Sequence, residues 1–145
     1  MSQKRDRNTN IYLHLLSNLT NNPDNGYQIP ITLNVSGQLI SGIMIGEEEF
    51  YNLNLNAIFK PIHDALNIEK KDFFNEDGTI KDHLTEEDIE KIPDSYCQKF
   101  LYLKNARYIS GSVFLPSEDS DAAAISIRLS DVSSYSFGAF STSKN

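Results

Sequence analysis

The segment from residue 27 to residue 45 constrains the fold most, because its polarity alternates with the period of a β-strand. From residue 27 to residue 35, the inward-facing apolar set is Ile29, Ile31, Leu33 and Val35. A period of two places these side chains on one face of a half-buried strand. The turn formers Ser36 and Gly37 follow, and a second apolar run extends from Gln38 to Ile45. The sequence therefore predicts a β-hairpin with a tight turn at Ser36-Gly37.

Three residues of this hairpin suggest further local structure. Pro30 has no N–H to donate, so we expect that end of its strand to lie at a sheet edge. Gly37 and Gly42 have the G-x-x-x-x-G spacing of a phosphate-binding loop, but Lys followed by Ser or Thr is missing after Gly42. We therefore expect Gly37 to serve the turn and Gly42 to mark a bulge or a close backbone contact.

A short amphipathic helix is predicted before the hairpin, over residues 9–20. Thr9 or Asn8 can cap it, and a run of turn formers from Asn21 to Gly26 ends it. Its apolar side chains fall on one stripe at helical spacing, and they are Ile11, Tyr12, Leu15, Leu16 and Leu19.

After the hairpin the pattern changes to short helices. The three glutamates Glu47–Glu49 place negative charge at a helix N-terminus, where the macrodipole favours it. Pro61 ends this helix or begins the next one. Thr85 and Asp88 have the spacing of a capping box at the start of another helix.

This helical stretch holds all of the net charge. Residues 47–99 carry 14 Asp and Glu against 6 Lys, a balance of −8, whereas residues 1–46 carry +1 and residues 100–145 carry 0. The chain as a whole has a formal charge of −7. An acidic surface repels phosphate backbones, so we expect no nucleic acid as the main ligand.

Strand patterns return in the last third of the chain, over residues 99–114, 125–129 and 132–140. Sequential strands with short links favour an antiparallel sheet. We therefore predict an α+β fold: a small twisted antiparallel sheet, able to curl into an open, Sm-like barrel, with an N-terminal helix and an acidic helical insertion.

We expect one domain over residues 1–145. It divides into residues 1–46 (N-terminal helix and hairpin), residues 47–99 (the acidic insertion) and residues 100–145 (the last strands and a short tail). The single cysteine, Cys97, cannot form an internal disulfide, and no signal peptide or membrane-length apolar run is recognisable. The predicted compartment is therefore the cytosol.

Candidate catalytic and metal-binding residues are sparse. His14, His63 and His83 lack a second His or Cys at ligand spacing, so we expect solvated histidines. Cys97 has no activating base nearby in the sequence. The stretch Asn75–Gly78 looks like part of a calcium loop, but that register puts Phe and Leu at the first and last ligand positions, which favours a plain turn. We expect no catalytic residue, no cofactor, no metal and no enzymatic activity.

The final strand supports two interpretations. Ser alternates with Tyr and Phe from residue 133 to residue 141, which fits a strand but also resembles the composition of adhesive segments. Both hold if the strand lies at a sheet edge, because open edges recruit partners. The candidate interaction residues are Tyr135, Phe137, Phe140, Tyr102 and Tyr108.

Three stretches taken together resemble a known family. They run from Ile31 to Ile45, from Phe100 to Tyr108, and from Arg128 to Gly138. In this order they resemble the gas vesicle accessory protein U (GvpU) family, with its pattern ITLxVxGxxISGxxI followed by FIHLKNxxI. The chain departs from the family where we expect a Trp-Arg pair, because Ile125-Ser126 stands there.

The resemblance covers about residues 28–51 and 99–142. It implies a minor, non-shell protein that influences the assembly or clustering of gas vesicles in a prokaryotic cytoplasm. Its expected partners are other copies of itself, as a homo-oligomer, and vesicle proteins or the vesicle surface, with no membrane and no cofactor involved. The alternatives are a small nucleic-acid-binding barrel, by analogy of fold alone, and an enzyme or small-ligand protein with an apolar pocket.

Overall fold

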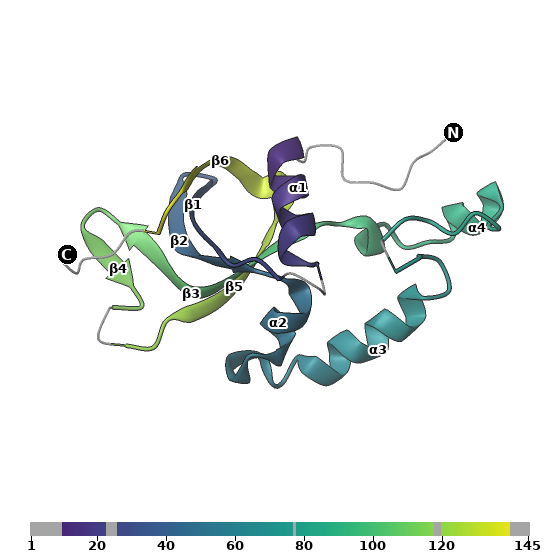
Figure 1. The fold of residues 1–145 in the computed structure, drawn as a ribbon, viewed down its shortest axis with the longest axis horizontal. Helices are drawn as coiled ribbons and strands as arrows, with labels where there is room; N and C mark the ends of the chain where they lie inside the picture. The colour runs from purple at the N-terminus through teal and green to yellow at the C-terminus, as the bar shows by residue number, and fades with distance from the viewer. Residues whose placement is uncertain (1–9, 23–25, 77, 118–119, 140–145) are drawn as a thin grey trace.

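An antiparallel six-stranded sheet forms the centre of the molecule (Figure 1). The computed structural model describes residues 10–22, 26–76, 78–117 and 120–139. The strands are β1 (Ile29–Val35), β2 (Gln38–Ile45), β3 (Phe100–Ser110), β4 (Val113–Leu115), β5 (Ala123–Arg128) and β6 (Val132–Phe137). The α-helices are α1 (Ile11–Thr20), α2 (Glu47–Asn52), α3 (Lys60–Lys70) and α4 (Glu86–Glu90). Short 3₁₀ turns lie at η1 (Asn54–Asn56), η2 (Asp94–Cys97) and η3 (Leu129–Asp131).

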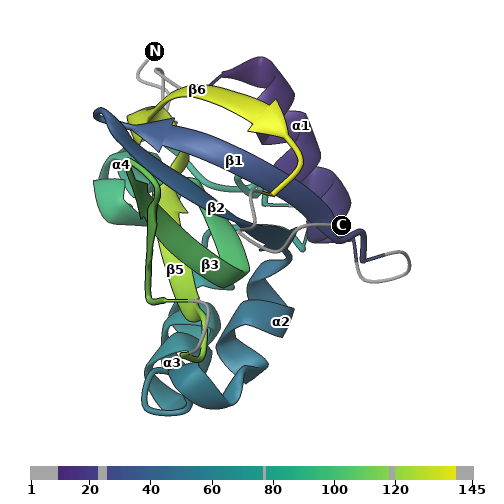
Figure 2. The same ribbon diagram turned by 90° about the vertical axis from the view of Figure 1, so that its left-hand side faces the viewer.

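The strand order is β4-β3-β2-β1-β6. The remaining strand, β5, also pairs with β3. β5 and β6 are consecutive in the chain, joined by η3, yet they pair with different strands, β3 and β1. The sheet therefore curls (Figure 2). No pairing between β5 and β6 joins its two sides within the described ranges, so the sheet does not close into a barrel. The predicted α+β fold with a small antiparallel sheet is confirmed.

The predicted hairpin is confirmed as β1 and β2. Val35 pairs with Gln38, which leaves Ser36 and Gly37 as a two-residue turn. Their φ angles are 53° and 89°, and two positive values in succession match the right-handed twist of the flanking strands. The Asn34 side-chain carbonyl accepts a hydrogen bond of 2.8 Å from the Gly37 N–H.

As predicted, Pro30 lies at an end of β1 that has only β2 as a paired strand, although the rest of β1 lies between β2 and β6. Pro30 sits where the pairing with β6 ends, and its carbonyl accepts a hydrogen bond from the Gly138 N–H at 2.8 Å. In such an antiparallel pair the second bond would run from residue 30 to the Gly138 carbonyl. Proline cannot donate it, and the Thr32 hydroxyl donates to that carbonyl instead, at 2.8 Å.

Gly42 marks both a bulge and a close contact, as the sequence predicted. The register between β2 and β3 shifts at this residue. A Cβ placed there would lie 3.1 Å from the Cα of Ala106 and from the carbonyl oxygen of Lys104. These distances are tighter than most Cβ contacts, so a side chain at this position would push β2 and β3 apart by a few tenths of an ångström.

The main core lies between α1 and the sheet (Figures 1 and 2). Its fully packed members are Leu13, Ile31, Leu33, Ile40, Met44, Leu101, Leu103, Ala106, Ile127 and Leu129. A smaller cluster of Ile45, Phe50 and Tyr102 joins α2 to β3. Both clusters draw on β2 and β3, so these two strands connect the body of the domain with the insertion.

α1 differs from its prediction in its cap and in its buried face. Asn10 is the cap, and its side-chain oxygen accepts hydrogen bonds from Tyr12 and Leu13; Thr9 and Asn8 lie outside the described residues. The buried residues are Leu13, Ser17 and Thr20. Four members of the predicted apolar stripe are exposed instead, and they are Ile11, Tyr12, Leu15 and Leu19.

The acidic insertion leaves the sheet after β2 and returns to it at β3, extending away from the strands (Figure 1). Its two ends meet where Ile45 pairs with Tyr102. The predicted capping box is present: Thr85 and Asp88 exchange two hydrogen bonds of 3.1 Å. Hydrogen bonding to Thr85, chiefly from its backbone N–H and then with its side chain, lowers the pKa of the Asp88 carboxyl.

The turn predicted at Asn75–Gly78 is present, with Gly78 donating to the Asn75 carbonyl at 3.0 Å and Phe74 bridging to Ile80. None of the described helices has the length and apolar character needed to cross a membrane.

Replacing Gly46 with alanine tests the junction between α1 and the sheet. A Cβ at Gly46 would overlap the carbonyl of Thr20, whereas its φ of −78° suits any residue. We expect Gly46→Ala to lower the free energy of unfolding by about 1–3 kcal/mol, measured by urea denaturation. Gly26→Ala is the control, since its nearest atom lies at 3.9 Å. Equal stability of the two variants would contradict this packing.

Candidate functional site

α3 presents its apolar side to solvent and its polar side to the protein. His63 is its buried residue, with 6% of the side chain exposed. Ile62 is 65% exposed, and Ile58, in the turn before the helix, is 77% exposed. The exposed apolar residues here called the α3 face are Ile58, Phe59, Ile62 and Leu66. This orientation is the reverse of an ordinary surface helix, whose apolar stripe faces the core.

His63 holds the first turn of α3 against α2. Its ring stacks on Tyr51, with centroids 3.9 Å apart and planes inclined by 14°. Nε2 lies 3.1 Å from the Asn67 amide nitrogen and 3.6 Å from a Glu48 carboxylate oxygen, and Nδ1 lies 4.0 Å from Glu47. The solvated state predicted for this histidine is therefore wrong, because α2 and α3 enclose it.

Behind Tyr51, a second tyrosine fixes α2 to the sheet. The Tyr102 hydroxyl donates to a Glu47 carboxylate oxygen at 3.3 Å, and its ring lies 4.9 Å from that of Phe50. Burial, reinforced by the negative charge of Glu47, raises the pKa of the Tyr102 hydroxyl far above its ordinary value. Burial also raises the pKa of Tyr51, again with a contribution from Glu47. Both phenols therefore stay neutral and act as hydrogen-bonding parts of the joint.

The other end of α3 is held by Tyr96 of η2. The Tyr96 hydroxyl donates to a Glu69 carboxylate oxygen at 2.8 Å, and the Lys70 ammonium lies 5.6 Å from the centre of the Tyr96 ring. The hydrogen bond to Glu69 raises the pKa of the Tyr96 hydroxyl. Polar contacts thus fix α3 at both ends and leave its apolar middle uncovered.

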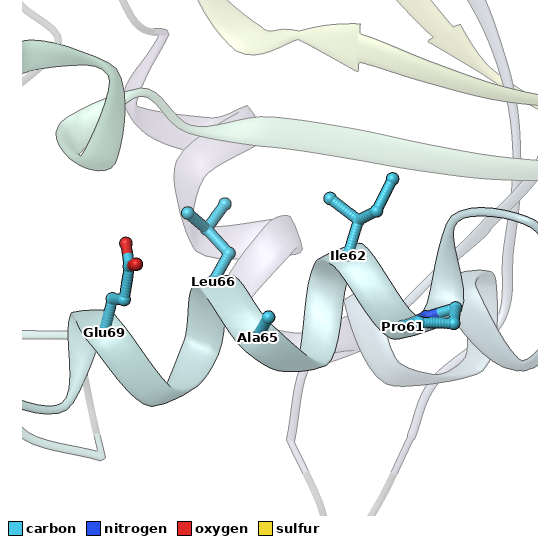
Figure 3. Close-up of a pocket in the computed structure, with 5 residues that line it drawn as sticks. All are labelled: Pro61, Ile62, Ala65, Leu66 and Glu69. Carbon is cyan, nitrogen blue, oxygen red and sulfur yellow. The ribbon is translucent and has the colours of Figure 1, made fainter.

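A groove of about 390 Å³ runs along this middle, lined by Pro61, Ile62, Ala65, Leu66 and Glu69 (Figure 3). Ile62 and Leu66 project from the same side of the helix, one turn apart, with Glu69 beyond them. The carboxylate of Glu69 is held by Tyr96. The lining is therefore suited to apolar side chains of a partner and offers no set of converging polar groups.

α1 exposes a second apolar surface. The α1 face consists of Ile11, Tyr12, Leu15 and Leu19, all exposed. Helical spacing identified these residues in the sequence but not their orientation. Because the opposite side of α1 also carries leucines, Leu13 and Leu16, periodicity alone could not decide which side the sheet would bury.

The predicted interaction residues differ in how exposed their side chains are. Phe137 is 66% exposed on β6, and Tyr108 is exposed on β3. Tyr135 is half-buried and packs against the core, with its ring 6.1 Å from that of Phe137. Tyr102 is only 7% exposed, so it has little surface to offer a partner. Phe140 lies outside the described residues.

β6 is an edge strand in the described part of the sheet, since it pairs with β1 alone. The strand interpretation of the Ser, Tyr and Phe alternation is thus confirmed as far as Phe137. Its adhesive interpretation stays a prediction. Among the described residues, no three His, Cys, Asp or Glu side chains come together in a way that could hold a metal ion, and Cys97 is buried.

The comparison with protein families decides the identity. A family model described as gas vesicle protein GvpU-like matches residues 10–140. This chain belongs to the GvpU-like family. No curated protein and no solved structure matches it. The match includes the whole acidic insertion, so in this GvpU-like protein α3 and its groove lie within the stretch that the family model describes.

The role assigned to His63 can be tested by removing its ring. In this GvpU-like chain we expect His63→Ala to loosen α3, because the stack on Tyr51 and the contact with Asn67 are lost. A buried aromatic contact contributes about 1 kcal/mol, so amide hydrogen exchange in residues 60–70 should become roughly fivefold faster. His83→Ala, at an exposed position, is the control. Unchanged exchange in α3 would contradict its attachment through His63.

Proposed function

We propose that this protein is a non-enzymatic accessory protein that modulates the assembly or clustering of gas vesicles through self-association and protein–protein contacts. Membership of the GvpU-like family supplies the connection to gas vesicles. The proposed mode of action rests on one observation: α1 and α3 expose apolar side chains. Exposed apolar patches on a globular domain mark sites of association with other proteins.

The sheet edge offers a further surface of the same kind. The outer side of β6 can accept another extended strand, and the exposed ring of Phe137 lies beside it. At the other end of the strand order, the short strand β4 exposes Val113 and Leu115. Partners that bind at either edge would gain main-chain hydrogen bonds in addition to apolar contact.

The basic side chains support protein partners over nucleic acid. Lys104 is paired with Glu49 at 2.7 Å, and Lys60 with Asp64 at 2.9 Å. Arg107 donates to three backbone carbonyls, those of Pro116, Ser117 and Ser120. These cations serve internal contacts, and the insertion around α3 is acidic. The nucleic-acid-binding alternative would need basic groups turned outward on one face.

The site of action that we propose is the cytoplasmic surface of the vesicles. The chain would bind there through its apolar helix faces or its sheet edges. Its own copies would then connect one vesicle with another, or one shell component with the next. Neither step requires a bond to be made or broken, so no cofactor enters the proposal.

Flotation with purified gas vesicles tests the proposed function. Vesicles rise on gentle centrifugation, and we expect the protein to rise with them and to increase their turbidity by clustering. An otherwise identical sample containing vesicles collapsed by pressure is the control for buoyancy. Protein that remains in the lower layer while the intact vesicles rise would contradict the proposed role.

The charge of the protein predicts how salt changes self-association. Chains with a net charge of −7 repel one another, and salt screens that repulsion while leaving apolar attraction. We expect light scattering of the purified protein to increase between about 0.05 M and about 0.5 M NaCl, as the Debye length falls below roughly 10 Å. Scattering that is constant or decreases over this range would contradict the proposed balance between charge repulsion and apolar attraction.

A further inference from the structure

The outer edge of β6 carries backbone groups that no described strand pairs with. The Gly138 N–H donates to the Pro30 carbonyl, and the Gly138 carbonyl accepts from Thr32, so both backbone groups of residue 138 point toward β1. Backbone groups alternate in direction along a strand of an antiparallel pair. Those of Tyr135 and Phe137 therefore point away from β1. On that side, no strand of the described residues pairs with β6.

The other strands at the rim of the sheet carry features that hinder pairing. β4 has three residues and is followed by Pro116. In β5, Ala124 packs against the cluster that joins α2 to β3. A short strand, a proline and a covering segment are usual ways of blocking a sheet edge.

β6 lacks these features. It has six residues, and no charged residue or proline lies between positions 132 and 139. Its register against β1 shifts opposite Asn34 and Val35, which leaves Ser133 in a bulge and residues 134–137 as a regular strand. Ser134, Ser136 and Phe137 are exposed. This edge is therefore open to an added strand.

The direction of the backbone groups determines the kind of occupant. N–H and C=O groups that alternate along an edge are satisfied by another extended segment. Phe137 pairs with the fully buried Ile31, so its ring lies on the face of the sheet that carries the core, yet it is 66% exposed. A strand added beside β6 would continue this face past Phe137 and cover the ring.

Charge favours a second copy of the chain at this edge. The net negative charge lies in residues 47–99, with 14 acidic groups against 6 lysines. α2 and α3 of that segment lie at the opposite end of the molecule from β6 (Figures 1 and 2). Contact through α3 would bring two acidic segments together, whereas contact through the uncharged β6 keeps them apart.

We infer that β6 of one copy pairs antiparallel with β6 of a second copy, about a two-fold axis at Ser136. This inference rests on the self-association contained in the proposed function and identifies the surface that produces it. In this register Tyr135 of each copy lies opposite Phe137 of the other, and each such pair exchanges both of its backbone hydrogen bonds. The product is a closed dimer, because both copies use the same strand.

The aromatic side chains select the register. With the axis at Ser136, the Tyr135 and Phe137 rings of the two copies meet on one face, and aromatic cross-strand pairs stabilise sheets. An axis at Tyr135 would place Phe137 opposite Ser133, which lies in the bulge. Only the first register covers the exposed Phe137 ring with another ring directly opposite.

Cysteine crosslinking tests both the contact and its register. Two copies of residue 136 would face each other with Cα atoms about 4.5 Å apart, which permits a disulfide. We expect Ser136→Cys to give a covalent dimer with oxidised glutathione, seen on a non-reducing gel. Ser134→Cys is the matched control, because two copies of this exposed serine would lie about 13 Å apart along the strands. The native Cys97 is buried, and the unmodified chain serves as its control.

Two outcomes of the crosslinking would overturn the inference. One is equal or greater crosslinking of Ser134→Cys. The other is a Ser136→Cys chain that crosslinks only after residues 140–145 are removed, because the end of its own chain would then be the occupant of the edge.

A charge exchange at the same position provides a second, reversible readout. Like charges directly opposite one another destabilise a strand pair. In sedimentation velocity at about 0.05 M NaCl, we expect Ser136→Lys alone and Ser136→Glu alone to dimerise roughly fivefold more weakly than the unmodified chain. Their equal mixture should recover the loss. Ser134→Lys is the matched control and should dimerise like the unmodified chain.

This design separates a local contact from an effect of net charge. Lysine makes the acidic chain less negative and glutamate makes it more negative, so net charge cannot explain weakening by both. An unmodified chain that stays monomeric, or a mixture that associates as weakly as each variant alone, would overturn the inference.

The outcomes also separate this inference from the proposed function. A chain without the β6 contact that still floats with vesicles and clusters them contradicts the β6 pairing alone. A chain that pairs through β6, but neither floats with vesicles nor clusters them, contradicts the proposed function alone.

Discussion

The pairing of β2 with β3 is the constraint on which the rest of the structure depends. These strands are separated in the chain by the whole acidic insertion, yet Ile45 pairs with Tyr102 and Ile40 with Tyr108. Gly42 favours the close approach of the two strands, because a Cβ there would lie 3.1 Å from Ala106. Both apolar clusters use residues of these strands, so their pairing closes the core and brings the two ends of the insertion together. The entropic cost of closing a loop grows only slowly with its length, so an insertion of this size is tolerated.

The insertion is attached to this sheet by a polar and aromatic joint. Glu47 accepts a hydrogen bond from Tyr102, and Glu49 pairs with Lys104, so the acidic start of α2 is bound to β3. His63 then carries the attachment from α2 to α3 through its stack on Tyr51. Because polar groups make these contacts, the apolar side of α3 is left for solvent or for a partner. The exposed surface is thus a consequence of how the joint is built.

Much of the fold follows from local patterns in the sequence. The turn at Ser36-Gly37 and the capping box at Thr85 were predicted correctly, because each depends on residues within a few positions of one another. Gly42 was also interpreted correctly, from an interruption in an apolar strand. The prediction that His63 is solvated was wrong, and the sequence did not show that Tyr102 is buried. Each depended on which distant segment lies beside the residue: α2 around His63, and α2 over Tyr102.

The sequence alone determined the periods of the elements, the acidic character of residues 47–99, and the resemblance to the GvpU family that the match over residues 10–140 confirms. Tertiary structure decided the orientation of the helices. α1 has leucines on both sides, and the sheet buries Leu13 and leaves Leu15 exposed. The polar side of α3 faces α2 because His63 stacks on Tyr51. Periodicity defines the faces of a helix, but only contacts between segments far apart in the chain select the face that is buried.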